Sequence, residues 1–180
     1  DKHALYIHMD GARIANACAA LNTTPDKISK ECGVDVLSFG GTKNGMMAGE
    51  ALIYFKPELA KNTLFHRKQA MQLASKMRFI SAQFTALLKD NLYIKNGGNA
   101  NAMANYLAQQ IEYMPGLTLW QRAEANALFV KIDKEAAKRL LEEYFFYFWD
   151  EDESIVRWMT SFNTTREDID LFVDALKRAF

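Results

Sequence analysis

The sequence has little cysteine, no excess of charge and no long apolar run, and each absence excludes a class of protein. Its two cysteines, Cys18 and Cys32, lie in no CxxC or Cys/His pattern, so we expect no metal site and no disulfide framework, and we predict a reducing, cytoplasmic location. Because 22 basic residues balance 22 acidic ones, no net field favours nucleic acid or an anionic membrane as a partner. The longest apolar run is far shorter than the roughly 20 residues that cross a bilayer.

What the sequence does contain is 180 residues with 49% hydrophobic side chains, enough for one domain with a substantial core or for two small lobes. Short apolar runs typical of buried strands occur three times in the first third of the chain. The first run ends on a carboxylate, Asp10, and Gly11 after it indicates a turn. The predicted strands are ALYIHMD (residues 4–10), VDVLSF (34–39) and EALIYF (50–55).

Two helical patterns lie between the first two of these strands. The segment ARIANACAALN (12–22) combines good helix formers with small residues. In TPDKISKEC (24–32), Thr24 can serve as the N-cap and Pro25 as the first helical residue, which predicts a second helix.

The middle of the chain has a longer helical pattern. Apolar residues recur every three to four positions over 57–91, which predicts one long helix, or two helices joined near Arg78. The Asn- and Gly-rich residues 96–99 indicate a break before another helix at 100–112. Beyond it, strand-like and helix-like segments alternate, and the last helix starts at Thr165 with Asp168 in a capping-box arrangement. We therefore expect an α+β lobe after the first sheet.

The loop SFGGTKNGMMAG (38–49) surrounds one lysine, Lys43, with glycines. A phosphate-binding P-loop would need a glycine directly before the lysine and Ser or Thr directly after it. Here Thr42 and Asn44 occupy those positions, so the P-loop is excluded by spacing. A plain turn with a solvated lysine remains the simplest alternative.

Asp10 and Arg13 flank the turn after the first predicted strand, at the edge where open α/β sheets bind ligands. They can form a local ion pair, or they can line a site together with Lys43. An Asp, an Arg and a Lys at neighbouring strand ends are a combination that pyridoxal phosphate needs, because its aldehyde bonds a lysine amine and its pyridine nitrogen needs a carboxylate. Glycines would let the lysine loop pass close to a flat ring.

The motifs HMDGARIANA and LSFGGTKNG together resemble the low-specificity threonine aldolase group of β-eliminating lyases, which use pyridoxal phosphate on the aspartate aminotransferase fold (fold type I). The similarity continues through KMRFISAQ to VRWMTSFNTTREDIDLFV. By this resemblance Lys43 is the Schiff-base lysine, and Asp10 is the partner of the pyridine nitrogen. Arg13 contacts the cofactor or the substrate carboxylate. Thr42 is a candidate to hydrogen-bond the cofactor, or only its own loop.

The resemblance also implies an α/β fold in two parts. Residues 1–78 are expected to form the C-terminal portion of the large cofactor-binding domain, with a mostly parallel sheet and helices. Residues 79–180 are expected to form a small α+β C-terminal domain, with the boundary inside a long helix.

Arg157 lies between Val156 and Trp158 in an apolar strand, where a lone charge is costly unless it is paired. An arginine on an edge strand facing water is the alternative. In the resembling family the matching arginine binds the α-carboxylate of the substrate, which suits the planar fork of the guanidinium.

Other polar and aromatic residues have simpler interpretations. His8 shares the strand face of Asp10, and we expect a packed, hydrogen-bonded histidine rather than a catalytic base. Ser38 is expected to bond its own loop, and Lys76 to lie on a solvated helical face. The aromatic block 144–149 is expected in a core or an interface, not as a platform for stacking nucleotide bases.

The activity implied is cleavage of threonine or allo-threonine, as a small amino acid substrate, to glycine and an aldehyde. Another pyridoxal phosphate lyase that eliminates a β-substituent, and a non-catalytic α/β fragment, remain alternatives. The family's N-terminal half has no counterpart in this sequence, so a missing half or a companion chain is expected, and the isolated chain is predicted to be inactive. Relatives form homodimers or homotetramers, which is the assembly that the resemblance implies.

Overall fold

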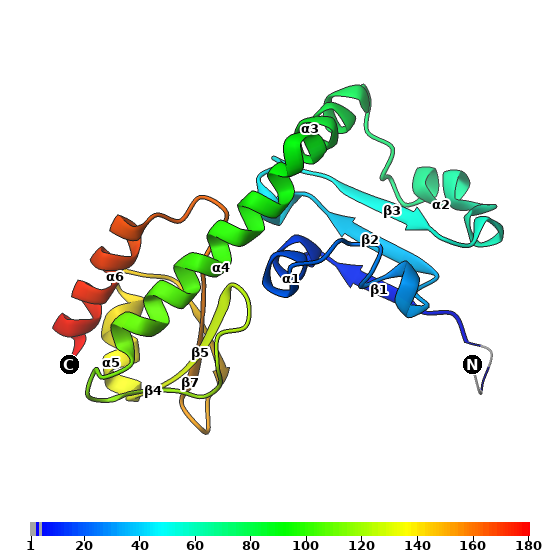
Figure 1. The fold of residues 1–180 in the computed structure, drawn as a ribbon. Helices are drawn as coiled ribbons and strands as arrows, with labels where there is room; N and C mark the ends of the chain where they lie inside the picture. Colours follow the sequence, from blue (N-terminus) through cyan, green and yellow to red (C-terminus); the bar gives the residue numbers. More distant parts are fainter. Residues whose placement is uncertain (1–2, 4) are drawn as a thin grey trace. The chain divides into compact units, whose positions relative to one another are not determined.

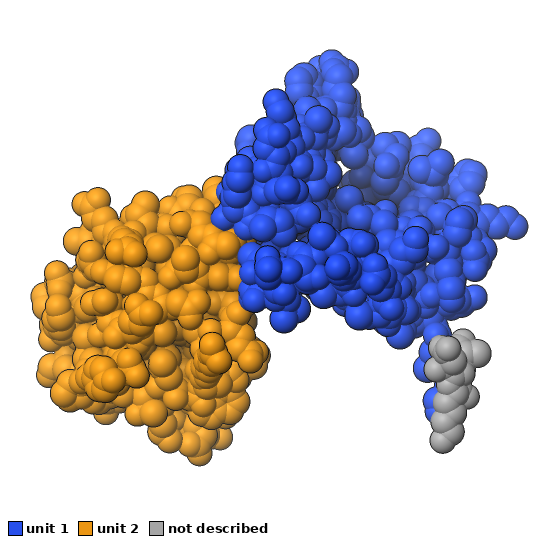
Figure 2. All heavy atoms as spheres, viewed as in Figure 1, with its two compact units in different colours: residues 1–96 blue, residues 97–180 orange. Residues whose placement is uncertain are grey.

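The computed structural model describes residue 3 and residues 5–180, and the chain divides into two compact units (Figures 1 and 2). Unit 1 comprises residues 1–96 and unit 2 residues 97–180. Helix α4 (Leu92–Ile111) contributes residues to both. The division of the chain into domains at 78/79 stays a prediction, because compactness alone does not define the family's domains.

Unit 1 is built on a small sheet with the strand order β1–β2–β3. β1 and β2 run parallel, with Asp10 beside Ser38, and β3 runs antiparallel to β2. The three predicted strands are confirmed, although the first begins later than expected, and Ala4 of that prediction lies outside the described residues. The strands and the helix that follows the first of them are β1 (His8–Gly11), α1 (Ile14–Leu21), β2 (Val36–Gly40) and β3 (Glu50–Tyr54).

The core of unit 1 lies on one face of this sheet. Ile14 and Cys18 are four residues apart on α1, so both point to the same side of the helix and pack with Leu37 and Phe39 of β2. The Phe39 ring lies 6.1 Å from that of Tyr93, a residue of α4. The opposite face carries the polar residues of β1.

The N-terminal end of the sheet is closed by a buried carboxylate. Asp35 directly precedes β2, and its side chain accepts a hydrogen bond from the Ile7 backbone N–H at 2.8 Å and pairs with Lys56 Nζ at 2.7 Å. Lys56 and the Ile7 N–H hold the pKa of Asp35 below its ordinary value, because both stabilise the charged form. These contacts tie together the strand ends remote from Lys43.

The predicted helix at 24–32 is wrong. Ser29 bonds the Pro25 carbonyl through its hydroxyl, so this segment closes into turns and ends in the short 3₁₀ helix η1 (Lys30–Cys32). Over 57–91 the two-helix alternative is correct: the 3₁₀ helix η3 (Pro57–Ala60) and α2 (Thr63–Gln69) precede a break, and α3 (Arg78–Leu88) starts after it.

The predicted break at 96–99 is also wrong, because α4 runs through Gly97 and Gly98 without interruption. The chain bends earlier, in η4 (Lys89–Asn91), where Asp90 and Asn91 adopt the left-handed conformation. The side-chain amide of Asn96 donates to a distant backbone carbonyl and does not compete for the backbone of its own helix. Tertiary contacts therefore override the local preference for a turn.

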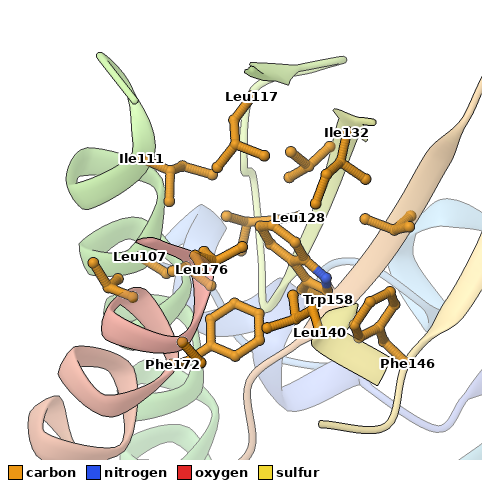
Figure 3. Close-up of a cluster of buried hydrophobic side chains, with 14 of the residues drawn as sticks. Leu107, Ile111, Leu117, Leu128, Ile132, Leu140, Phe146, Trp158, Phe172 and Leu176 are labelled. Carbon is orange, nitrogen blue, oxygen red and sulfur yellow. The ribbon is translucent and has the colours of Figure 1, made fainter. Parts of the chain in front are cut away.

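Unit 2 contains an antiparallel sheet in the order β4–β5–β7–β6. Helices α4, α5 and α6 supply the apolar side chains that cover one face (Figure 1). Figure 3 shows the indole of Trp158 among Leu140, Phe146 and Phe172 in this core. The elements after α4 are β4 (Leu117–Leu119), β5 (Ala127–Ile132), α5 (Lys134–Leu141), β6 (Tyr147–Asp150), β7 (Ile155–Met159) and α6 (Arg166–Ala179).

The predicted capping box at the start of α6 is confirmed. Thr165 Oγ1 accepts a hydrogen bond from the Asp168 N–H, and Asp168 Oδ2 accepts from the Thr165 N–H at 2.8 Å. These bonds from the Thr165 backbone and hydroxyl hold the pKa of Asp168 below its ordinary value, because they stabilise the carboxylate.

We expect the stabilisation from Asp168 to depend on pH. Its pKa in the folded chain lies below the ordinary value of 3.8, so the contribution is fully present above 3.8 and is lost as the pH falls through the lower folded-state pKa. The Asp168→Asn variant should therefore be less stable than the wild type near neutral pH, with the difference vanishing in acid. Urea denaturation of both proteins across the pH range measures this.

Glu167→Gln is the matched control, since it removes a neighbouring charge of the first helical turn outside the capping box. If both variants lose the same stability with the same pH dependence, the helix dipole and not the capping box is responsible.

Candidate functional site

The predicted site residues of unit 1 gather at the C-terminal edge of its two parallel strands. Asp10 is the third residue of β1, and Lys43 follows the end of β2 on the short 3₁₀ helix η2 (Thr42–Asn44). Because β1 and β2 are parallel and adjacent, their C-terminal ends lie at the same edge. Arg13 is exposed at the start of α1, directly after the turn that Asp10 opens.

The Asp10 carboxylate is exposed and oriented by its own turn. Its Oδ1 accepts a hydrogen bond from the Ala12 N–H at 3.0 Å. His8, on the same strand face, shares a hydrogen bond of 2.8 Å with Ser38, the register partner of Asp10. His8 is hydrogen-bonded as predicted, but it is exposed rather than packed, and Ser38 bonds this histidine instead of its own loop. The open face of the strands thus presents a polar row that includes Asp10.

The loop that carries Lys43 is closed by hydrogen bonds across its base. The Gly41 N–H donates to the Gly49 carbonyl at 3.1 Å, and the Gly49 N–H donates to Thr42 Oγ1 at 3.1 Å. The Lys43 side chain itself is exposed. Thr42 therefore holds the loop in shape, while the amine next to it is accessible to a ligand.

A glycine brings this loop against the turn of Asp10. A Cβ at Gly40 would lie 2.8 Å from Ala12 Cα, closer than real Cβ contacts allow. Gly49 has φ +156, and a Cβ there would lie 2.6 Å from Met46 Cε. These two glycines are explained by the packing of the protein against itself. The close approach of Gly40 and Ala12 places the carboxylate turn and the lysine loop next to each other.

Asn44 fastens the lysine loop to the first turns of α4, and the sequence analysis did not single it out. Its side chain is 4% exposed, and its Nδ2 donates to the Tyr93 carbonyl at 3.0 Å. In return, Asn96 Nδ2 donates to the Asn44 carbonyl at 2.8 Å. An asparagine directly after the lysine of a Gly-rich loop is the only local feature of the sequence at this position.

Arg157 belongs to unit 2 and lies on β7, between β5 and β6, so the edge-strand alternative is wrong. Its Nε is buried and has no hydrogen-bond partner within the described residues. The guanidinium carbon lies 5.6 Å from the centre of the Trp149 ring and 6.0 Å from that of Tyr147. The cation is held by aromatic rings, and its N–H donors are suited to an anion.

The remaining residues singled out from the sequence have structural surroundings. Arg78 lies over the ring of Phe79 at 4.9 Å, and Lys76 is exposed. Of the aromatic block 144–149, Phe146 is in the core of unit 2.

Across residues 3 and 5–180, we find no group of three or more His, Cys, Asp or Glu side chains arranged to hold a metal ion. In the same residues, no helix is both long and apolar enough to cross a membrane.

Comparison with known proteins places these residues in a family context. The model of the beta-eliminating lyase family matches residues 1–135. A low specificity L-threonine aldolase of Pseudomonas aeruginosa is 41% identical over 165 residues, which cover 92% of this chain and 48% of that protein. A protein of the same name from a Pseudomonas species is 41% identical over 160 residues, or 89% of this chain and 46% of the relative. The chain thus spans about half the length of the curated relatives it matches.

Solved structures agree with this. A threonine aldolase of Leishmania major superposes with a TM-score of 0.86 at 32% identity, covering 98% of this chain and 52% of that chain. A cysteine desulfurase of Escherichia coli superposes with a TM-score of 0.64 at 14% identity, covering 99% of this chain and 52% of that chain, which is a likeness of fold alone. These likenesses confirm the predicted fold class.

We expect Asn44→Ala to loosen the lysine loop. The substitution removes the side-chain donor to the part-buried Tyr93 carbonyl, and a typical intramolecular hydrogen bond contributes about 0.5–1.5 kcal/mol of unfolding free energy. Backbone amides of residues 41–49 should exchange hydrogen faster, as measured by mass spectrometry. Lys43→Ala is the matched control, because it truncates the exposed neighbour without touching the clamp. Equal exchange in both variants and the wild type would show that Asn44 does not hold the loop.

Proposed function

The chain belongs to the beta-eliminating lyase family, and we propose that it forms about half of an enzyme that splits threonine or allo-threonine into glycine and an aldehyde. The proposal is carried by Asp10 and Lys43, which end neighbouring parallel strands in a chain 41% identical to low specificity L-threonine aldolases. The exposed amine of Lys43 adds the nucleophile that such a site requires.

Pyridoxal phosphate is the cofactor of this family, and the residues present fit it. An accessible amine and an oriented carboxylate at one sheet edge are the two groups that the cofactor demands of a protein. When bound, it supplies a protonated pyridine ring that accepts the electron pair released from the substrate's Cα. The amine of Lys43 and the carboxylate of Asp10 therefore support pyridoxal phosphate as the cofactor.

Each of the site residues has a proposed task. Lys43 holds the cofactor through its amine, and Asp10 keeps the proton on the pyridine nitrogen, since a nearby carboxylate favours the charged ring. Arg157 binds the substrate's α-carboxylate through parallel N–H donors. Arg13 contacts the ring hydroxyl region or the same carboxylate, and Thr42 contacts the cofactor in addition to closing the loop.

A second lyase activity, elimination of a β-substituent, is favoured by the description of the family model itself. It would use the same lysine and carboxylate on a different substrate. Elimination releases an α-keto acid and ammonia, whereas cleavage of threonine releases acetaldehyde and glycine. The products therefore distinguish the two activities.

We further propose that an N-terminal half, in the same protein or in a companion chain, completes the site, and that the assembly is a homodimer or homotetramer. The partial coverage of the relatives supports the first part. Large exposed apolar side chains of unit 1, such as Leu64 and Phe65, support a covering partner. The two free cysteines support a reducing, cytoplasmic location.

The experiment joins this chain to the N-terminal half of the Pseudomonas aeruginosa relative and assays aldehyde release from L-threonine and L-allo-threonine. Lys43→Arg should reduce the rate to the uncatalysed background, because a guanidinium keeps the charge but is not a nucleophilic amine. Lys30→Arg, an exposed lysine of η1, is the matched control and should retain the wild-type rate.

Aldehyde release that survives in Lys43→Arg would contradict the assignment of the lysine. If the joined wild type gives no aldehyde but releases a keto acid from O-acetyl-L-serine, elimination replaces cleavage as its function. If it gives neither product, the non-catalytic alternative holds.

Arg157→Ala in the joined enzyme should raise KM for threonine roughly 10- to 100-fold, since a hydrogen bond to a charged group contributes about 1.5–3 kcal/mol. The effect on kcat should be smaller, because the carboxylate is bound before and during the reaction. Steady-state kinetics measure the two constants, and Arg166→Ala, at the start of α6, is the control. An unchanged KM would remove Arg157 from the substrate site.

A further inference from the structure

A row of side chains crosses the open face of the sheet in unit 2. Phe129 of β5 and Tyr147 of β6 are both register partners of Arg157 on β7. Partners in neighbouring strands point to the same side of a sheet, so these three residues lie side by side. The next residues along each strand, such as Leu128 and Val156, point to the opposite side and into the core. The row is therefore separate from the packing that stabilises the unit.

A β-bulge adds Trp149 to this row. Phe148 pairs with Val156 and Asp150 pairs with Ile155, so Trp149 is the extra residue that has no partner position of its own. Bulges re-aim a side chain relative to the regular ladder. Here the Trp149 ring packs edge-to-face against Phe129 at 4.9 Å and lies 5.6 Å from the guanidinium carbon of Arg157. Trp149 is thus a second aromatic ring of β6 that lies beside the cation, besides Tyr147.

Aromatic rings hold a cation differently from a carboxylate. The ring faces attract the guanidinium electrostatically but accept no strong hydrogen bond from its edge. The Nε of Arg157 is buried and has no hydrogen-bond partner in the described residues, so no protein acceptor fixes this edge of the guanidinium. Glu153, two residues before β7, pairs with Lys131 Nζ at 2.8 Å, and within the described residues Arg157 forms no ion pair. Arg157 is thus oriented without being neutralised.

We propose that Trp149, with Tyr147, positions the guanidinium of Arg157 to bind the α-carboxylate of an amino acid. This inference rests on the proposed function, in which Arg157 is the carboxylate-binding residue. Trp149 acts through Arg157 and touches no reacting atom. It is 54% exposed, so its contribution to the core is small, and a role in orienting the cation explains why a large indole is held there.

The test follows the Nε–H signal of Arg157 by ¹H–¹⁵N NMR in the 180-residue chain during titration with sodium acetate at constant ionic strength. The signal is assigned by its loss in Arg157→Lys. Trp149→Leu removes the ring but keeps an apolar side chain, and it should weaken acetate binding roughly 3- to 30-fold, the range that a cation–π interaction supplies. Trp149→Phe keeps an aromatic face and should restore most of the affinity.

Trp120→Leu is the matched control. Trp120 is 55% exposed and packs on Phe129 at 6.2 Å. Within the described residues its ring does not lie over the guanidinium of Arg157, so Trp120→Leu should leave acetate binding unchanged. If Trp149→Leu binds acetate as the wild type does, or if Trp120→Leu weakens binding equally, the proposal is overturned. Absence of any acetate response in the wild type would overturn it as well.

The same variants in the joined enzyme separate this proposal from the proposed function. Trp149→Leu should raise KM for threonine with a smaller change in kcat, whereas a merely structural role would lower the yield of folded protein and leave KM unchanged. Acetate binding that depends on Trp149, in an enzyme that cleaves neither threonine isomer, would overturn the proposed function and support the positioning role.

Discussion

The close backbone contact between Gly40 and Ala12 is the constraint on which the site of unit 1 depends. Ala12 also donates the hydrogen bond that orients the Asp10 carboxylate, and Gly40 leads directly into the loop of Lys43. The contact therefore fixes the spacing between the turn that carries the acid and the loop that carries the amine. A side chain at position 40 would push the two apart, because the atoms it meets belong to the backbone and have no freedom to move aside.

The positions of Asp10 and Lys43 at strand ends could be predicted from the sequence, because one lies at the end of a short apolar strand and the other just after one. The capping box of α6 was equally visible, since its partners are three residues apart. The Asn44 clamp was not, because its partners Tyr93 and Asn96 lie 49 and 52 residues away. The hydrogen bond from the Asn96 side chain to the Asn44 carbonyl also helps to explain why α4 continues through residues 96–99, whose composition indicated a turn.

Arg157 shows what a local sequence pattern can predict and what it cannot. A charge between two apolar residues correctly indicated a costly position in a strand, but the place of that strand in the sheet depends on pairings that span the whole unit. The two rings beside the guanidinium come from the neighbouring strand β6, and the pairing of β6 with β7 is not visible in a local pattern. In the part of the chain that the structure describes, the charge lies beside aromatic faces and has no counter-ion.

The glycine pair inside α4 affects how stiff this helix is. Gly97 and Gly98 stand at the boundary of the two units, each costing up to about 1 kcal/mol of helix propensity relative to alanine. Residues without a Cβ leave the helix weakest against bending, and paired small residues are where sharp kinks arise. Intrinsic helix propensity in α4 is therefore lowest directly after Asn96, the residue whose side chain holds the loop of Lys43.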